Sequence, residues 1–332
     1  MGNKFLLNPG PTNTRFRTKY AQWKGSDVCH RTPEFYNILE ETKELLLNRF
    51  EYWRHSKFTI ALMGGSGTTA MEAMISSLIN KNITIINAGI YGQRAIDMMK
   101  IYGIKYNEVK CKNIGELKSN KKYKNVYFVE NETTTGEKFD VDKMSELYPN
   151  AKFYIDATSS FGSSNYRNSI NQIAALSFCS NKCLQSTPGV GIVIWDSELK
   201  IKSKSYYCDL KRYIGNDIPF TLPVQSVYAL NKTLKISSNN QEIFRNRRDM
   251  LIDDLSKVDI ECINVYPSNS IIGFKHPTMD YETLKDYLYE KGIVIYAGVK
   301  GVKNSFRLST MSVLFERKYK FLIKRLYDSC LR

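Results

Sequence analysis

The chain has 332 residues, of which 42% are hydrophobic and 24% are charged, and its formal net charge is +15. This balance is ordinary for a folded protein and argues against disorder, while the length favours about two domains. The lysines are scattered along the chain rather than gathered in stripes or tails. The excess charge therefore indicates a solvated basic surface rather than a nucleic-acid binder, with a general attraction for small anions as the alternative.

The seven cysteines form no C-x-x-C pair, and their number is odd. That pattern disfavours both a disulfide framework and a zinc site, so we expect no metal. The apolar run at the start of the chain is too short for a signal peptide, and no stretch approaches the roughly 20 apolar residues of a membrane span. We therefore expect a cytoplasmic protein that contacts neither membrane nor nucleic acid.

The first two thirds of the chain predict an α/β unit. A helix over 32–52 begins with Thr32 as a possible cap and Pro33 at the first helical position. Short apolar runs then alternate with helical stretches. Strands are predicted at 58–63, 83–87, 126–129, 153–155, 174–178 and 190–195, and helices at 68–78, 94–102 and 141–147. Such alternation is typical of a large, mostly parallel sheet with helices on both faces.

The pattern changes after about Asp196. A long helix is predicted over 224–258, with a possible break at 237–240. Strands at 271–274, 293–296 and 306–309 and helices at 281–290 and 314–331 complete a small C-terminal α+β domain. The predicted organisation is thus an N-terminal segment near the active site (1–20), a large α/β domain (21–222), and a long helix with the small domain (223–332).

A glycine-rich turn follows the predicted strand that ends at Met63. In an α/β sheet, ligands bind beyond the carboxyl ends of the strands. The turn reads Gly64-Gly65-Ser66-Gly67-Thr68-Thr69 and opens a helix. Backbone N–H groups, the helix dipole and the hydroxyls there favour a phosphate, although no lysine follows as in a Walker loop. A tight turn with a capping serine is the alternative.

A carboxylate and an amine follow two neighbouring predicted strands. Asp156 ends the strand at 153–155, and Lys182 lies just past the next strand. A lone carboxylate is costly to bury without a cationic partner. One arrangement that uses both groups is pyridoxal 5′-phosphate, carried by the lysine with the aspartate at its ring nitrogen. A buried salt bridge, or two unrelated surface charges, would fit the spacing equally well.

Six short motifs together resemble the class V branch of the fold-type-I aminotransferases, and within it the aminoethylphosphonate transaminases. They occur in matching order over nearly the whole chain. They are PGP at 9–11, GSGT at 65–68, GIYGQR at 89–94, ETTTG at 132–136, DATSSFG at 156–162 and SNKCLQ at 180–185. Each motif alone is weak, but six in order are specific. The resemblance implies a fold-type-I enzyme that uses pyridoxal 5′-phosphate.

The resemblance also implies roles for individual residues. Lys182 would carry the cofactor as a Schiff base, and Asp156 would hold the ring nitrogen protonated. Tyr91 would stack on the ring, and Thr134 would approach the side of its phenolic oxygen. The implied phosphate site consists of Ser66, Gly67, Thr68 and Asn181.

Further residues are implied at the substrate side and at a subunit interface. Arg307 would grip the substrate carboxylate, since its planar fork matches a carboxylate. The turn at Pro9 and Gly10 would lie near the substrate. Thr221 would enter the phosphate site of a neighbouring subunit, which implies a homodimer. The implied reaction is a ping-pong transfer of an amino group between 2-aminoethylphosphonate and pyruvate, two small anionic substrates.

Some segments depart from the aminoethylphosphonate transaminases. The stretch CHRTPEF at 29–35 is closer to alanine:glyoxylate and serine:pyruvate aminotransferases, which are the alternative together with a lyase of the same fold. His30 or Arg31 could supply a positive group for a second anionic end of the substrate, or both could pair with local carboxylates. Cysteine desulfurases are disfavoured, because Asn181 and Tyr91 stand where that group has histidines.

Overall fold

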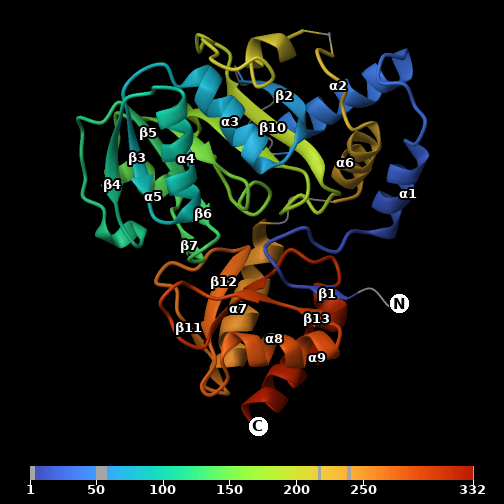
Figure 1. Ribbon diagram of the computed structural model, residues 1–332, viewed down its shortest axis with the longest axis vertical. Coiled ribbons are helices and arrows are strands. Elements are labelled where there is room, and N and C mark those ends of the chain that lie inside the picture. The colour runs from blue at the N-terminus through green and yellow to red at the C-terminus, as the bar shows by residue number, and fades with distance from the viewer. Residues whose placement is uncertain (1–3, 50–57, 216–217, 238–240, 332) are drawn as a thin grey trace.

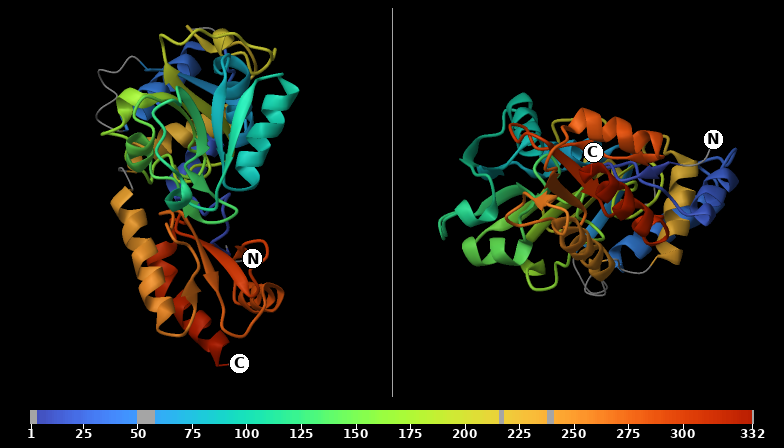
Figure 2. Two further views of the ribbon diagram at one scale, coloured as in Figure 1. Left: turned by 90° about the vertical axis from the view of Figure 1, so that its left-hand side faces the viewer. Right: turned by 90° about the horizontal axis from the view of Figure 1, so that it is seen from below.

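The computed structural model describes residues 4–49, 58–215, 218–237 and 241–331, which form two lobes (Figures 1 and 2). The larger lobe is built on a seven-stranded sheet with the order β2-β10-β9-β8-β5-β3-β4. Its strands are β2 (Phe58–Gly65), β3 (Ile83–Asn87), β4 (Tyr106–Lys110), β5 (Asn125–Val129), β8 (Lys152–Asp156), β9 (Ile173–Cys179) and β10 (Gly189–Asp196). The pairs from β9 to β4 are parallel, whereas β10 is antiparallel to both neighbours. The predicted mostly parallel sheet is confirmed.

Helices cover both faces of this sheet. The helices α3 (Gly67–Leu78) and α4 (Ile90–Ile101) lie on one face, and α2 (Pro33–Leu47), α5 (Val141–Leu147) and α6 (Val224–Ile236) contribute to the core on the other. Side chains along a strand alternate between the two cores. In β5, for example, Val126 and Phe128 join one core, while Tyr127 and Val129 join the other. Burial on both faces explains why these strands are apolar along most of their length.

The smaller lobe packs helices against a second sheet. The sheet has the order β11-β12-β15-β14, with strands at Glu261–Cys262, Ile271–Lys275, Ser305–Ser309 and Tyr296–Ala297. Its helices are α7 (Gln241–Ser256), α8 (Tyr281–Glu290) and α9 (Phe315–Cys330). A hairpin of β6 (Asn131–Glu132) and β7 (Glu137–Lys138) lies between this lobe and the large one in Figure 1. Short 3₁₀ helices cover Ile114–Glu116, Ile170–Gln172 and Leu210–Tyr213.

The N-terminal segment joins the two lobes. Strand β1 (Phe5–Leu6) pairs in parallel with β13 (Ile293–Val294), so Phe5 and Leu7 belong to the core of the small lobe. The chain then crosses to the large lobe, where α1 (Phe16–Lys24) packs against α6 (Figure 1). We call residues 7–15 the N-terminal strap. It passes the carboxyl ends of the large sheet's strands.

Several predicted boundaries differ from the structure. The long helix predicted over 224–258 is two helices, because α6 ends at Ile236 and Ser237 is extended; residues 238–240 of the predicted break lie outside the described residues. Helix α2 ends at Leu47, and the predicted end at Tyr52 likewise lies outside them. The strand predicted at 293–296 is two short strands, β13 and β14, with different partners. Helix α1 and strand β4 were not predicted.

Helix α4 begins at Ile90, four residues before its predicted start. Its N-cap, Gly89, has no side chain to cap the first turn. The carboxylate of Glu132 instead accepts hydrogen bonds from the N–H groups of Tyr91 (3.2 Å) and Gly92 (3.4 Å). A cap supplied from a distant part of the chain leaves no local sequence signal. In the described residues, no helix is both long and apolar enough to cross a membrane.

The core below the active site should be sensitive to truncation at Phe178. This side chain is fully buried in β9 and stacks on Phe161, with ring centroids 3.7 Å apart. Phe178→Ala should lower the free energy of unfolding by about 3–5 kcal/mol, because it leaves a cavity. The control Ile101→Ala, at a site that is 79% exposed, should change it by less than about 0.5 kcal/mol. Equal urea midpoints for the two variants, measured by circular dichroism, would contradict the expectation.

Candidate active site

A cavity of about 160 Å³ lies at the carboxyl ends of the strands of the large sheet. It is lined by Ser66, Gly67, Thr68, Met71, Tyr91, Arg94, Asp156, Thr158, Cys179, Asn181 and Lys182. Seven of these were predicted site residues, and the fold brings them together from four separate loops. Larger clefts, of about 450 and 340 Å³, lie at the opposite edge of the sheet. These clefts are lined largely by lysines, asparagines and apolar side chains. The candidate site is therefore identified by the residues that line it and not by its volume.

Asp156 is the last residue of β8 and is only 2% exposed. The backbone N–H of Thr158 donates to its carboxylate at 2.9 Å. Burial raises the pKa of Asp156 to about 6, and the nearby Glu132 acts in the same direction. A buried carboxylate beside an open cavity fits a cationic group such as a protonated ring nitrogen, which would restore the low pKa. The residues present therefore fit pyridoxal 5′-phosphate at this end of the cavity.

Lys182 follows β9 and is held by the N-terminal strap. Its Nζ donates to the backbone carbonyl of Pro9 at 2.7 Å. A Cβ on Gly10, whose φ is +132°, would lie 2.8 Å from Cδ of Lys182, so only glycine fits there without displacement. Burial lowers the pKa of Lys182, which favours a neutral, nucleophilic amine. No ion pair within 4.0 Å joins Lys182 to Asp156 in the described residues, so the predicted alternative of a salt bridge is not what brings them together.

The predicted phosphate loop surrounds the start of α3. Ser66 is the N-cap of this helix, and its hydroxyl accepts from the N–H of Thr68 at 3.2 Å. The alternative of a capping serine is therefore correct, and it leaves the hydroxyl proton of Ser66 free to donate. A Cβ on Gly67 would lie 2.7 Å from the side chain of Thr158, so glycine lets the helix approach the loop after Asp156. Such a helix N-terminus favours an anion.

Arg94 is a site residue that sequence reasoning missed. Its guanidinium lies 4.6 Å from the centroid of the Tyr91 ring, and its Nη1 donates to Oγ1 of Thr68 at 2.9 Å. It therefore ties the aromatic wall of the cavity to the phosphate loop. The available signal was its position three residues after Tyr91, which places both side chains on the same face of α4.

Thr134 and Tyr91 share one buried carboxylate. Glu132 accepts from the hydroxyl of Thr134 at 2.5 Å and from the N–H of Tyr91 at 3.2 Å. Burial raises the pKa of Glu132, while these hydrogen bonds oppose the rise. A Cβ on Gly89 would meet both Glu132 and Thr134, at 2.6 and 2.7 Å. Glu132, which the sequence placed in a motif without a role, thus positions two predicted cofactor contacts.

Arg307 projects from β15 and is 6% exposed. Its Nε donates to the carbonyl of Ala297 at 2.5 Å, and its Nη1 donates to the carbonyl of Thr133. Its guanidinium lies 5.0 Å from the centroid of the Tyr296 ring. No carboxylate pairs with it within 4.0 Å in the described part of the chain. Arg307 is thus a buried cation, held by carbonyls next to Thr134.

Seven predicted site residues are absent from the lining of this cavity: Pro9, Gly10, His30, Arg31, Thr134, Thr221 and Arg307. His30 and Arg31 lie in the turn between α1 and α2, where His30 is half-buried and Arg31 is exposed. Thr221 is exposed, and its carbonyl lies 3.7 Å from where a Cβ on Gly64 would be. Thr221 therefore runs beside the strand that leads into the phosphate loop.

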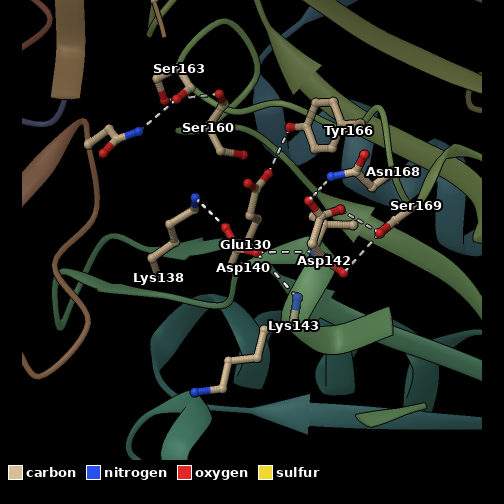
Figure 3. A network of polar contacts seen from close by, with 12 residues as sticks. Glu130, Lys138, Asp140, Asp142, Lys143, Ser160, Ser163, Tyr166, Asn168 and Ser169 are labelled. Carbon is tan, nitrogen blue, oxygen red and sulfur yellow. Dashed lines mark hydrogen bonds and ion pairs between the residues drawn. The ribbon is translucent and has the colours of Figure 1, made fainter. Parts of the chain in front are cut away.

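A polar network that includes Glu130, Tyr166 and Ser160 lies beside the loop between β8 and β9 (Figure 3). The N–H of Glu130 donates to the carbonyl of Asp156 at 3.0 Å. The hydroxyl of Tyr166 donates to the carboxylate of Glu130 at 2.7 Å. The side chain of Asn131 donates to the carbonyl of Ser159 at 2.9 Å. Burial raises the pKa of Glu130. These contacts fix the loop between β8 and β9, and none of them was predicted.

The pKa of Asp156 predicts a pH-dependent stability of the cofactor-free protein. The folded value of about 6 exceeds the roughly 3.9 of an unfolded aspartate, so stability is complete below about pH 4 and is lost as the pH rises through 6. Asp156→Asn removes this loss. The variant should be more stable than the wild type near pH 8, by up to about 3 kcal/mol, and equal near pH 4.

Thermal unfolding at several pH values checks this expectation. The exposed carboxylate Asp253 provides a control, because Asp253→Asn should show no such pH-dependent gain. An Asp156→Asn variant that is no more stable than the wild type near pH 8 would show that the carboxylate is not destabilised by its burial.

Comparison with known proteins agrees with this site. Residues 12–315 match the family described as aminotransferase class-V. A 2-aminoethylphosphonate–pyruvate transaminase from Bacillus cereus is 28% identical over 358 residues, covering 98% of this chain and 96% of the relative. A bifunctional phosphonoacetaldehyde hydrolase/aminoethylphosphonate transaminase from Clostridioides difficile is 26% identical, and this chain spans 54% of its length.

Solved structures share the fold. An aspartate aminotransferase from Thermus thermophilus superposes with a TM-score of 0.86 at 20% identity, covering 98% of this chain and 99% of that one. An alanine–glyoxylate aminotransferase from Nostoc gives 0.85 at 21% identity, covering 100% and 96%. The predicted fold-type-I architecture and the predicted cofactor are confirmed. The chain belongs to the class V aminotransferases and is a pyridoxal-phosphate-dependent transaminase.

Proposed function

We propose that this transaminase exchanges an amino group between 2-aminoethylphosphonate, or phosphonoacetaldehyde, and the pyruvate/alanine pair. The main support is the buried cation Arg307, which lies beside Thr134 and has no carboxylate partner in the described residues. A buried charge without a counterion is costly and favours an anionic ligand. Relatives named for this reaction align over nearly the whole chain, which supports a role in phosphonate metabolism.

Five residues of the cavity have a task in this proposal. Bound pyridoxal phosphate supplies an electron sink for the carbanion formed at the substrate carbon. Asp156 keeps a proton on the ring nitrogen, and Tyr91 covers one ring face. Thr68 and Asn181 hold the phosphate at the start of α3. Lys182 would hold the cofactor, and its Nζ would take a proton from the substrate carbon and return it within the same site. Two substrates would use the site in turn.

We also propose a homodimer in which Thr221 completes the phosphate end of the partner's site. Thr221 is exposed in the single chain, although its segment runs along the phosphate loop. Helix α1 offers a second reason for an interface. Its aromatic side chains Phe16 and Trp23 are 80% and 68% exposed, and their rings lie 6.5 and 5.7 Å from the ring of Tyr20 between centroids. Large apolar side chains gathered on one surface favour a covered face.

A second candidate is transfer between alanine or serine and glyoxylate or pyruvate. The stretch at 29–35 favours it, because it is closer to those aminotransferases than to the phosphonate enzymes. His30 or Arg31 would then decide how a second anionic end is bound. A lyase reaction on the same cofactor would use the same Lys182 and Asp156.

The absorbance spectrum of the purified enzyme tests cofactor, lysine and donor together. We expect a visible band from the cofactor bound to Lys182, bleached by 2-aminoethylphosphonate and restored by pyruvate. Lys182→Ala should lack the band, since the amine is gone. Lys285→Ala, at a lysine on α8 in the small lobe, is the control and should keep it.

The other outcomes separate the candidates. A band that responds only to alanine or serine would replace the phosphonate by the second candidate. Bleaching without recovery by any keto acid would indicate a lyase. Absence of a band after addition of pyridoxal phosphate would contradict the role of Lys182.

Truncating Arg307 should weaken binding of the anionic substrate. A charge-assisted hydrogen bond contributes about 1.5–3 kcal/mol, so Arg307→Met should raise KM for the preferred donor roughly ten- to a hundredfold. The exposed Arg317→Met in α9 should leave KM unchanged. Steady-state kinetics measure both variants. The same comparison with Arg31→Ala examines the turn after α1, because an unchanged KM for every anionic substrate would remove Arg31 from the site.

A further inference from the structure

Gln185 lies at the junction of the lysine loop, the N-terminal strap and the small lobe. It follows Lys182 by one turn of chain and is only 1% exposed. Its backbone N–H donates to the carbonyl of Lys182 at 2.8 Å, which closes the turn that carries the lysine. Its φ of +60° is in the left-handed region, an uncommon conformation for a residue with a side chain. Surrounding contacts must therefore hold it.

The side-chain amide of Gln185 binds in two directions. Its Oε1 accepts from Nη1 of Arg15 at 2.9 Å, at the end of the N-terminal strap. Its Nε2 donates to the carbonyl of Met311 in the small lobe at 2.8 Å. The amide oxygen thus binds the N-terminal strap, and the amide nitrogen binds the small lobe. A carboxylate of the same shape could keep only the first bond, because it cannot donate to a carbonyl.

The two hydrogen-bond partners of the Gln185 amide are each held by further contacts, Met311 within the small lobe and Arg15 at the start of α1. Arg247 of α7 donates to the carbonyls of Thr310 (2.5 Å) and Ser312 (3.2 Å) on either side of Met311, and to Glu316 of α9. Met311 therefore moves with the small lobe. Arg15 directly precedes α1, which is bound to α6 by the hydroxyl contact between Thr18 and Thr233 at 2.9 Å.

The strap reaches Lys182 at its other end as well. Leu7 is bonded to the small lobe on both sides, since its N–H donates to Val294 at 2.8 Å and its carbonyl accepts from Ser309 at 2.8 Å. Two residues later, the carbonyl of Pro9 accepts from Nζ of Lys182. The lysine is thus fixed at its side-chain tip through Pro9 and at its backbone through Gln185.

We propose that Gln185 is a positioning residue that couples the placement of the small lobe and the N-terminal strap to the orientation of Lys182. The inference rests on the proposed role of Lys182 as the cofactor lysine. A shift of the small lobe would reach Lys182 through Met311 and Gln185. Through this coupling, Lys182 has the orientation seen in the structure only when both lobes and the strap are in contact.

The test compares Gln185→Met with Gln172→Met. Gln172 is a matched control, because its amide donates to the carbonyls of Tyr148 and Ala151 (3.0 and 3.1 Å) and accepts from Ser145, away from the cavity. In the cofactor-free protein, the pH dependence of Lys182 acylation by acetic anhydride, followed by peptide mass spectrometry, reports the state of the amine. The titratable groups that act on Lys182 are Cys179, Cys183 and Asp156, and all three remain in both variants.

We expect the acylation midpoint of Gln185→Met to move up, towards the value of an ordinary lysine, because the loosened turn admits water. Gln172→Met should keep the wild-type midpoint, although both variants lower the melting temperature. In the loaded enzyme, Gln185→Met should reduce kcat roughly ten- to a hundredfold with little change in KM, since misaimed groups slow the chemistry. A Gln185→Met midpoint equal to that of Gln172→Met would overturn the proposal.

Two further variants test the contacts of Gln185 with Arg15 and with Met311 separately, and they replace Gln185→Met if that variant does not fold. Gln185→Glu breaks the bond to Met311 and keeps Arg15, whereas Arg15→Met does the reverse. Each should raise the acylation midpoint, and the double variant should raise it by less than the sum, because both act through one side chain. An unchanged midpoint in both single variants would remove the coupling. Acylation needs neither cofactor nor substrate, so a wrong substrate assignment would leave this result intact.

Discussion

The main constraint on this structure is that Asp156 and Lys182 line one cavity without forming an ion pair. Asp156 is almost fully buried without a described cation within pairing distance, and Lys182 donates to a backbone carbonyl instead of to that carboxylate. Burial moves the pKa of the acid up and that of the amine down. Both shifts disfavour the charged forms in the empty cavity, and a ligand that offers a cationic nitrogen and an aldehyde would relieve them. The site is therefore prepared for its cofactor at some cost to the fold.

Buried acids outside the cavity hold that arrangement in place. Glu132 binds the start of α4 and the hydroxyl of Thr134, so one carboxylate sets the positions of Tyr91 and Thr134. Glu130 contacts Asp156 through the backbone and Tyr166 through its carboxylate. Each carboxylate costs free energy to bury, which its hydrogen bonds offset. Such networks over-determine the loops, and loops at the ends of parallel strands are otherwise the least constrained parts of an α/β domain.

The small lobe contributes to the site from outside the large sheet. Arg307 reaches the carbonyl of Thr133 next to Thr134, and the N-terminal strap lies between the lobes with Pro9 against Lys182. Under the proposed function, the substrate end would thus be formed by both lobes.

The alternation of apolar runs with helical stretches determined the large sheet, because strands buried on both faces must be apolar along their length. Motif order identified Lys182, Asp156 and the phosphate loop, since each lies directly after a predicted strand. Arg94 was missed although it lies only three residues from Tyr91, whereas Glu132 and Glu130 escaped prediction because their partners are distant in sequence. The start of α4 was misplaced for the same reason, as its cap comes from Glu132. What the amino-acid sequence determined by itself is most strands of the large sheet, the helices between them and the chemistry at their ends. Only the tertiary structure decided which loops share a carboxylate and how Gln185 joins three segments, because those contacts depend on how the lobes and the strap pack.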